Sequence, residues 1–459
     1  MGFLSLTFFV FLVVTLAAYH RCGPNRGWAN AVLAAASFVF YAWWDWRFLL
    51  LLLSTTLCDF VAARVIHASP SKAVRRAALA ACLTGNLGTL FLFKYFGFFA
   101  ENLARLLGEI LGVQVSPLTL AIGLPIGLSF YTFQAIAYVV DVYRGELEPE
   151  RRLTTYLAFA CFFPQLAAGP IERGAHMLPQ YRAYRAPTLE DAERAVRWLV
   201  YGYFLKVFVA DAVAPFADNG FEAGHQWAWW IAIGTLAFGI QIYADFCGYS
   251  YIARGLALLF GIDLMRNFDR PYWATSIRDF WRRWHISLSG WLRDYLYKPL
   301  GGSRHGPART YLSLMITMLL GGLWHGASWT FVLWGGWHGA LLVLNRFWSA
   351  RPWPRVPAFL GWLLTMLAVF SGWFLFRAQT MANAQLLVEN ARDFTWLPGH
   401  SEALRMMAAL CLPVILVEWA EKRKVVVARP AMWALLGMAA ALSYGAGLQL
   451  RPNFIYFQF

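Results

Sequence analysis

Two histidines within apolar stretches are the residues of this sequence whose type and setting could do chemistry. His325 stands in Gly-Gly-Leu-Trp-His-Gly at 321–326, and His338 stands in Trp-Gly-Gly-Trp-His-Gly at 334–339. An ionisable side chain in a membrane-spanning stretch is costly and points to function. The glycines let a second backbone or a substrate approach the imidazole. Histidine can take a proton from a hydroxyl near neutral pH, which suits acyl transfer to an alcohol. The alternative is a neutral imidazole that forms hydrogen bonds between helices.

The spacing of these histidines does not resemble a metal site. His325 and His338 are 13 residues apart and no carboxylate flanks either one, whereas zinc sites combine several His, Cys or carboxylate ligands at short spacings. This spacing therefore predicts no metal site. No tightly bound cofactor is expected either.

Other polar side chains lie in or beside apolar runs, where each could be a helix-end residue or a packing hydrogen bond. Gln134 is one of them, and Asp245 is another, within Tyr-Ala-Asp-Phe-Cys-Gly-Tyr-Ser at 243–250, where Gly248 and the aromatic residues indicate close packing. Lys206 and Asp211 are expected to form a structural pair near a membrane face.

Several enzyme signatures are missing from the sequence. It has no Gly-x-x-x-x-Gly-Lys-Ser/Thr loop, no Gly-x-Gly-x-x-Gly, no Gly-x-Ser-x-Gly and no His-Glu-x-x-His. Nucleotide hydrolysis, dinucleotide redox chemistry and a serine hydrolase of the nucleophile-elbow type therefore lose support.

The composition predicts the kind of protein that must position these residues. Of 459 residues, 59% are hydrophobic and 14% are charged, against about 25% charged in average globular proteins. This excludes a soluble globular, disordered or collagen-like chain and leaves an all-α polytopic membrane protein. The net charge of +14 comes from basic residues between apolar runs. They are expected to fix topology and to contact lipid headgroups, with no nucleic acid as partner.

Apolar runs recur along the chain, and about 11–13 transmembrane or re-entrant helices are expected from them. Gly and Pro interrupt one of the runs and end another. This favours a buried cavity with re-entrant pieces, because broken helices at membrane depth need protein or water around the freed backbone. The positive-inside rule predicts that the first helix runs from the outside to the cytoplasm. The runs are 3–19, 28–44, 47–66, 77–95, 117–140, 153–168, 195–216, 227–260, 310–324, 328–347, 358–377, 403–420 and 431–448.

The stretch 261–309 is the least like a membrane span and is rich in arginine. Aromatic and leucine residues recur there at spacings of four and three, which predicts an amphipathic helix at the cytoplasmic interface with its aromatic side down. Two pairs at i and i+4, Asp279 with Arg283 and Asp294 with Lys298, favour the same helix. The residues on the expected apolar face are Phe280, Trp284, Leu288, Trp291 and Tyr295.

Blocks of sequence along nearly the whole chain resemble the membrane-bound O-acyltransferases, and most closely their bacterial branch that includes alginate O-acetyltransferase. The blocks are Phe40-Tyr-Ala-Trp-Trp-Asp45, Lys94-Tyr-Phe-Gly-Phe98, Leu124-Pro-Ile-Gly-Leu-Ser-Phe-Tyr131, Tyr138-Val-Val-Asp-Val-Tyr-Arg-Gly145, Phe163-Pro-Gln-Leu-Ala-Ala-Gly-Pro-Ile171, Asp279-Phe-Trp-Arg-Arg-Trp-His-Ile-Ser-Leu-Ser289, Trp291-Leu-Arg-Asp-Tyr-Leu-Tyr297, Leu300-Gly-Gly302, Gly321-Gly-Leu-Trp-His-Gly326 and Phe454-Ile-Tyr-Phe-Gln-Phe459.

The resemblance implies a fold and two catalytic positions. The fold is a single membrane-embedded domain over 1–459, a ring of helices around a tunnel, with the catalytic histidine helices at 310–347. The Trp-His-Gly block implies that His325 is the catalytic histidine, with a second functional position at His285. Trp324 is expected to shape the tunnel, with Asp245, Gln134 and His338 as further lining. The segment 261–309 is then expected to line the donor entrance as well as to anchor the chain.

The resemblance also implies a reaction and its partners. An acyl group, in this branch usually acetyl, passes from a cytoplasmic thioester, acetyl-CoA or an acyl carrier, across the bacterial inner membrane. A separate periplasmic or extracellular acetyltransferase of the serine-hydrolase-like type completes the ester on a polysaccharide such as alginate. Membrane lipids surround the multi-pass chain.

Two departures from the family pattern bear on the acceptor and the partner. A family block Asp-Phe-Ser-Gly-Tyr-Ser-Asp reads Asp-Phe-Cys-Gly-Tyr-Ser-Tyr at 245–251, and Gly-Pro-Ile-Glu-Arg at 169–173 resembles the D-alanyl transferase of teichoic acid synthesis. D-alanyl transfer from a carrier protein is therefore the main alternative. A transporter or flippase is a second, and a purely structural scaffold fits poorly with broken helices and intramembrane histidines.

Overall fold

The structure, a computed structural model, describes residues 1–3, 5–112, 116–118, 120, 123–166, 169–222, 227–354 and 356–423. The span expected at 431–448 and the terminal block 454–459 lie outside these ranges. Within them the chain is helical, and its only β-type pairing is an isolated bridge between Trp227 and Asp393. The predicted all-α fold is confirmed.

Among the residues that the structure describes, six helical stretches are long and apolar enough to cross a membrane, which confirms a polytopic membrane protein. Two of them contain a short π-helical segment, at Phe91–Tyr95 and at Phe204–Ala210. Two shorter apolar helical stretches are Leu6–Arg21 and Leu153–Leu166. The six are Trp46–Ala68, Lys72–Leu111, Leu189–Gly220, Ala228–Leu259, Ala358–Arg377 and Pro398–Arg423.

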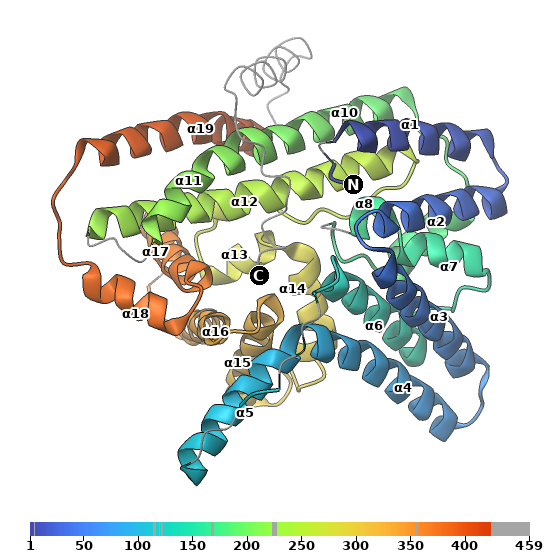
Figure 1. Cartoon of the computed structure of the whole chain (residues 1–459), viewed down its shortest axis with the longest axis horizontal. Coiled ribbons are helices and arrows are strands. Elements are labelled where there is room, and N and C mark those ends of the chain that lie inside the picture. The colour runs from blue at the N-terminus through green and yellow to red at the C-terminus, as the bar shows by residue number, and fades with distance from the viewer. Residues whose placement is uncertain are drawn as a thin grey trace. The chain divides into compact units, whose positions relative to one another are not determined.

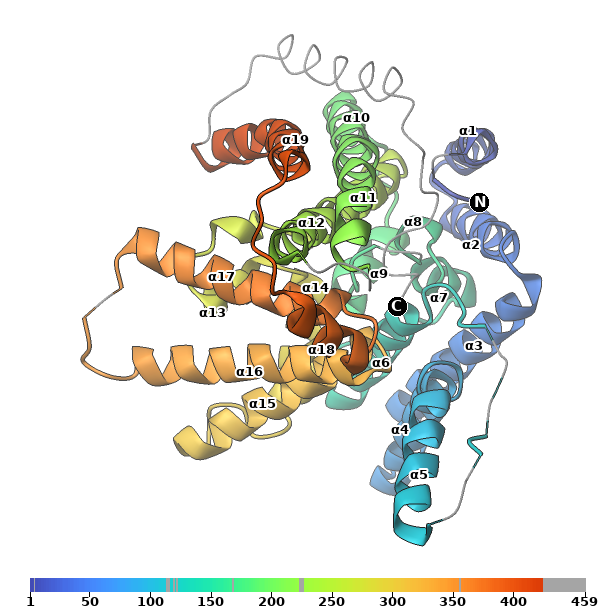
Figure 2. The same cartoon turned by 60° about the vertical axis from the view of Figure 1, so that its left-hand side comes forward.

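The described residues form two compact units. Unit 1 takes residues 1–195 and 253–265. Within it α3 and α4 pack together, and α6 packs against both (Figures 1 and 2). Its helices are α1 (Leu6–Arg21), α2 (Arg26–Ala42), α3 (Trp46–Ala68), α4 (Lys72–Leu90), α5 (Phe96–Leu111), α6 (Leu128–Arg144), α7 (Leu153–Ala160), α8 (Phe163–Leu166) and α9 (Gly174–Arg182).

The expected break in the apolar run 117–140 is found at the start of α6. Gly127 precedes the helix in the left-handed region, with φ of 73°, where glycine is favoured because it lacks a Cβ. A Cβ on Gly127 would also lie 2.3 Å from the carbonyl oxygen of Leu166. The helix therefore begins at Leu128, and the chain before it passes close to α8.

Unit 2 takes residues 196–252 and the described residues from Arg266 to Arg423. Helices α10 (Leu189–Tyr203) and α12 (Ala228–Leu259) continue from one unit into the other. The remaining helices of unit 2 are α11 (Asp211–Gly220), α13 (Ile277–Arg283), α14 (Ile286–Leu292), α15 (Gly306–His325), α16 (Trp329–Ser349), α17 (Ala358–Arg377), α18 (Met381–Asn390) and α19 (Pro398–Arg423), with a 3-10 turn at Pro271–Trp273 and a π-helical segment at Arg293–Tyr297.

Helices α15, α16 and α17 run side by side (Figure 2), and the two histidine motifs lie on α15 and α16. Glycines bring α15 and α16 close together. A Cβ on Gly322 would lie 2.2 Å from the carbonyl oxygen of Phe331, and a Cβ on Gly335 would lie 2.2 Å from that of Met318. These two glycines of the histidine motifs therefore serve helix packing.

The prediction of a single amphipathic helix through 280–295 is wrong. Helix α13 ends at Arg283 and α14 begins at Ile286, because His285 adopts a left-handed backbone conformation with φ of 43° and ψ of 57°. The expected ion pairs do form, with 2.9 Å between Arg283 Nε and Asp279 Oδ1 and 2.6 Å between Lys298 Nζ and Asp294 Oδ1.

The aromatic face expected to point into lipid is largely inside unit 2. Phe280, Trp284, Leu288 and Trp291 are buried. The break at His285 separates α13 from α14, so these residues do not lie on one continuous helix. The single domain over 1–459 and its ring around a tunnel stay predictions.

Candidate active site

His325 is the last residue of α15, and its side chain is 4% exposed. Its imidazole packs against three aromatic rings of unit 2, with centroid distances of 4.9 Å to Trp324, 5.0 Å to Trp334 and 5.2 Å to Phe376. Helix α15 ends here because Gly326 is extended. A Cβ on Gly326 would lie 2.1 Å from the ring of Phe331, so only glycine leaves room for this exit.

His338 lies on α16 and is fully buried. Its ring is 4.8 Å from that of Trp334 and 5.2 Å from that of Trp281. Neither ring nitrogen has a hydrogen-bond partner within the described part of the chain. A Cβ on Gly372 of α17 would lie 2.8 Å from Nε2 of His338. Trp334 thus contacts the imidazoles of both His325 and His338.

His285 is held by Asn267 in a strained backbone conformation. The Oδ1 of Asn267 accepts hydrogen bonds from the backbone N–H of Ser287 at 3.3 Å and from its hydroxyl at 2.9 Å. The same oxygen lies 3.1 Å from His285 Nδ1, and because a carbonyl oxygen only accepts, Nδ1 is the protonated nitrogen. Residues in this backbone region cluster at functional sites.

The protonation state of His285 follows from its burial. His285 lies between α13 and α14, outside the membrane-spanning helices, and burial lowers the pKa of its imidazole to about 3. The ring is therefore neutral at physiological pH, with Nε2 as its basic nitrogen. A neutral imidazole can accept or relay a hydrogen bond, but it does not supply a positive charge.

The structure brings four of the predicted site residues into one cluster. The ring of Trp324 lies 6.1 Å from His285 and 4.9 Å from His325, and Trp334 connects His325 to His338. Sequence reasoning missed Trp334 and Asn267 as members of this cluster. Trp334 stands four residues before His338, one helical turn, and that spacing could have indicated it. No spacing indicated Asn267.

Asp245 lies elsewhere in unit 2, in a buried ion-pair network. Lys206 Nζ is 2.7 Å from Asp245 Oδ1 and 2.8 Å from Asp211 Oδ1. The expected pair of Lys206 and Asp211 is confirmed, and Asp245 is a second partner that the sequence did not indicate. The expected place of Asp245 on a substrate path stays a prediction.

Gln134 belongs to unit 1. Its Nε2 donates to the carbonyl oxygen of Phe159 at 3.0 Å, and its Oε1 accepts from Gln165 Nε2 at 3.1 Å. The side chain thus takes part in a polar network of α6, α7 and α8.

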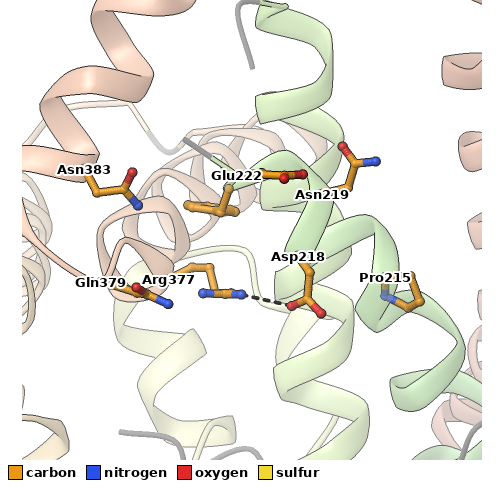
Figure 3. A pocket seen from close by; sticks show the side chains of 8 residues that line it. Pro215, Asp218, Asn219, Glu222, Arg377, Gln379 and Asn383 are labelled. Carbon is orange, nitrogen blue, oxygen red and sulfur yellow. Dashed lines mark hydrogen bonds and ion pairs between the residues drawn. The ribbon is translucent and has the colours of Figure 1, made fainter. Parts of the chain in front are cut away.

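A polar cavity of about 660 Å³ lies in unit 2 beside the end of α17 (Figure 3). Arg377 Nη2 donates to Asp218 Oδ1 at 2.9 Å across it. Arg377 follows Phe376, whose ring contacts His325. The other lining residues are Pro215, Asn219, Phe221, Glu222, Gln379 and Asn383. Over the described ranges, no three or more His, Cys, Asp or Glu side chains are grouped so that they could hold a metal ion.

Residues 150–385 match the family model of the membrane-bound O-acyltransferases. The matched region contains His285, Trp324, His325 and His338. The chain belongs to this family. It is therefore a membrane-embedded O-acyltransferase.

Two relatives of this acyltransferase match it over most of its length. The protein named probable alginate O-acetylase AlgI of Pseudomonas aeruginosa is 41% identical over 395 residues, which cover 84% of this chain and 74% of that protein. The peptidoglycan O-acetyltransferase of Helicobacter pylori is 35% identical over 414 residues, which cover 83% of this chain and 77% of that one.

A third relative matches a smaller part of the acyltransferase. The teichoic acid D-alanyltransferase of Streptococcus thermophilus is 29% identical over 240 residues, which cover 49% of this chain and 58% of that protein.

Replacing His338 tests whether its buried imidazole is kept for function. We expect His338→Leu to leave the free energy of unfolding unchanged or to raise it by about 1 kcal/mol, because the substitution removes two polar atoms that lack partners. We expect acyl transfer to fall at least about tenfold, as for a functional group kept at a cost to stability. Detergent unfolding and acyl-transfer assays on the same preparations measure the two effects.

His400 provides the matched control, because it is equally buried but accepts a hydrogen bond from the backbone N–H of Leu397 at 2.9 Å. His400→Leu should cost about 1–2 kcal/mol of unfolding free energy and leave acyl transfer intact. A His338→Leu protein that is destabilised yet fully active would mean that His338 only packs.

Proposed function

We propose that the chain moves an acetyl group from a cytoplasmic thioester across the membrane for O-acetylation of an exported or cell-envelope polysaccharide. The observation that carries the proposal is the buried cluster of His285, Trp324, His325 and His338 in a chain of this family. The names of the two best-covered relatives above, an alginate O-acetylase and a peptidoglycan O-acetyltransferase, support acetyl as the group and polysaccharide as the acceptor class.

His325 acts as the general base in this proposal. Its imidazole takes the proton of an acceptor hydroxyl, or of an intermediate nucleophile, while the oxygen attacks the carbonyl carbon of the thioester. The carbon–sulfur bond breaks, and the leaving thiolate receives the proton back from the imidazolium. The aromatic rings around His325 exclude water, which limits hydrolysis of the donor. His285 is a positioning residue for the thioester, because Asn267 fixes its ring.

The donor reaches the cluster from the side of the basic segment 261–309, which the positive-inside rule assigns to the cytoplasm. Arg278 and Arg282 are exposed one helical turn apart on α13. Guanidinium groups suit phosphate, which both acetyl-CoA and a phosphopantetheine carrier contain. The choice between these two donors is left to experiment.

The acyl group leaves on the opposite side. Helix α15 runs from the basic segment to His325, and α17 ends at Arg377 beside the polar cavity of Figure 3. The amide and carboxylate side chains that line this cavity suit a hydroxyl-bearing acceptor. A separate periplasmic or extracellular acetyltransferase of the serine-hydrolase-like type would receive the group there, with this chain in the inner membrane.

D-alanyl transfer to teichoic acid from a carrier protein remains the second candidate. It is favoured by the block at 169–173 and by the D-alanyltransferase relative. The transporter alternative has no such support, since the relatives named above are transferases.

Alkali-released acetate from the envelope polysaccharide tests the proposal. We expect a deletion strain to lose ester-linked acetate from one polymer fraction, and a plasmid copy of the gene to restore it, with released D-alanine unchanged in both. The fraction that loses acetate identifies the acceptor. Unchanged acetate together with lost D-alanine would reject acetyl transfer in favour of the second candidate.

A further inference from the structure

A small cavity in unit 1 takes no part in the chemistry proposed above. It has a volume of about 10 Å³, which leaves room for one species the size of a water molecule. Hydroxyl, carboxylate and amide side chains of α3, α6 and α7 line it. The polar lining residues are Thr55, Thr56, Asp59, Tyr131, Gln134 and Tyr156.

Asp59 is the ionisable residue of this cavity, and it is 1% exposed in the apolar helix α3. Its Oδ1 accepts hydrogen bonds from Cys82 Sγ at 2.9 Å and from Asn86 Nδ2 at 2.7 Å, both on α4. Its Oδ2 has no hydrogen-bond partner within the described part of the chain. A carboxylate at membrane depth is costly without a partner, so Oδ2 is the atom left for an occupant of the cavity.

Two other polar groups of the cavity, on Thr55 and Gln134, can offer lone pairs to an occupant. The Thr55 hydroxyl donates to the carbonyl oxygen of Leu51 at 3.0 Å, which leaves the oxygen itself as an acceptor. The Nε2 of Gln134 donates to the carbonyl oxygen of Phe159, and its Oε1 accepts one hydrogen bond from Gln165. One lone pair of Oε1 therefore remains for an occupant. A set of oxygen acceptors around one carboxylate is the ligand type that hard cations prefer.

We propose that this cavity binds one monovalent alkali cation, sodium by its size, on Asp59 Oδ2. The Thr55 hydroxyl and the Gln134 side-chain carbonyl serve as neutral ligands. One carboxylate balances one positive charge, so the occupied site is neutral within the membrane, whereas a divalent ion would leave one charge uncompensated. The proposal gives Gln134 a role, and it does not rest on acyl transfer, because the histidine cluster contains none of these residues.

Sodium-dependent thermal stability of the purified full-length protein tests the site. NaCl is titrated against choline chloride at constant ionic strength, with KCl as a parallel series. Ligand that binds only the folded state raises the unfolding temperature. We expect a saturable rise of about 3–6 °C at sodium concentrations far above the dissociation constant, and a smaller rise with potassium.

Three variants assign the effect to the cavity. Asp59→Asn should abolish the sodium-dependent rise. Thr55→Val keeps the carboxylate but removes a ligand, so it should raise the half-saturating sodium concentration about tenfold. Asp45→Asn is the matched control, because Asp45 caps the same helix from the surface and pairs with Arg47; its sodium response should equal that of the unmodified protein.

The competing occupant is a water molecule beside a protonated Asp59, and it predicts no sodium response. Equal effects of sodium, potassium and choline, or a full sodium response in Thr55→Val, would overturn the proposal. If Asp59→Asn does not fold, the sodium response of Thr55→Val alone tests the site. Since the readout is stability, failure of this proposal is distinguishable from failure of the acetyl-transfer assay.

Discussion

His325→Ala is expected to reduce acyl transfer by about 10²–10⁴-fold, the contribution typical of a general base. The acceptor hydroxyl would then have to lose its proton to water in a site from which aromatic rings exclude water. Polymer-bound acetate should fall to the level of the deletion strain at matched protein amounts. Because alanine leaves a gap among Trp324, Trp334 and Phe376, His325→Gln should be measured beside it and should be comparably inactive with less loss of stability.

A histidine at the other end of the same helix serves as the control. His305 precedes α15 and is exposed, so His305→Ala should leave both protein amount and acetate unchanged. If His325→Gln folds and keeps more than about a tenth of the activity, His325 cannot be the general base, and His285 or His338 would have to be tested for that role.

The sequence predicted the membrane fold because apolar runs are long and charges are few. Helix α12 over 228–259 agrees with the run expected at 227–260 to within one residue at each end. The run expected at 77–95 extends through a π-helical segment to Leu111, since the polar residues Glu101 and Arg105 lower the hydropathy of α5 without breaking it. Hydropathy thus located the apolar part of this helical stretch but not its C-terminal end.

The backbone at His285 shows what periodicity cannot predict. Its neighbours repeat at helical spacing, which predicted one continuous helix. The break depends on Asn267, 18 residues earlier, whose side chain and carbonyl bond to residues 285–287. A tertiary contact of this kind overrides local pattern, and it fixes one of the two histidines that the family resemblance singled out.

Asp245 shows a second limit of sequence reasoning. The local sequence around an acidic residue, here glycine and aromatic residues, is the same whether its side chain faces a substrate or a buried cation. What distinguishes the two is Lys206, on another helical stretch of unit 2, and no sequence spacing links residues 39 positions apart.

Lys206→Met is expected to lower the free energy of unfolding by about 3–5 kcal/mol. The side chains of Lys206, Asp211 and Asp245 are each at most 3% exposed, so the substitution removes the ammonium that lies within 2.8 Å of both buried carboxylates. Methionine keeps the length and apolar contacts of the lysine stem, which limits the effect to the lost charge. Unfolding in denaturing detergent, followed by tryptophan fluorescence, measures the change.

A surface pair separates this effect from the general loss of a lysine. Lys298 pairs with Asp294 at 2.6 Å, but its side chain is 58% exposed, so Lys298→Met should cost less than about 1 kcal/mol. Adding Asp245→Asn to Lys206→Met should recover part of the lost stability, because one uncompensated charge is removed with its partner. Two results would contradict this prediction. One is an equal loss of unfolding free energy in Lys206→Met and Lys298→Met. The other is a double variant that is no more stable than Lys206→Met. In either case the place on a substrate path that was first expected for Asp245 would have to be tested directly.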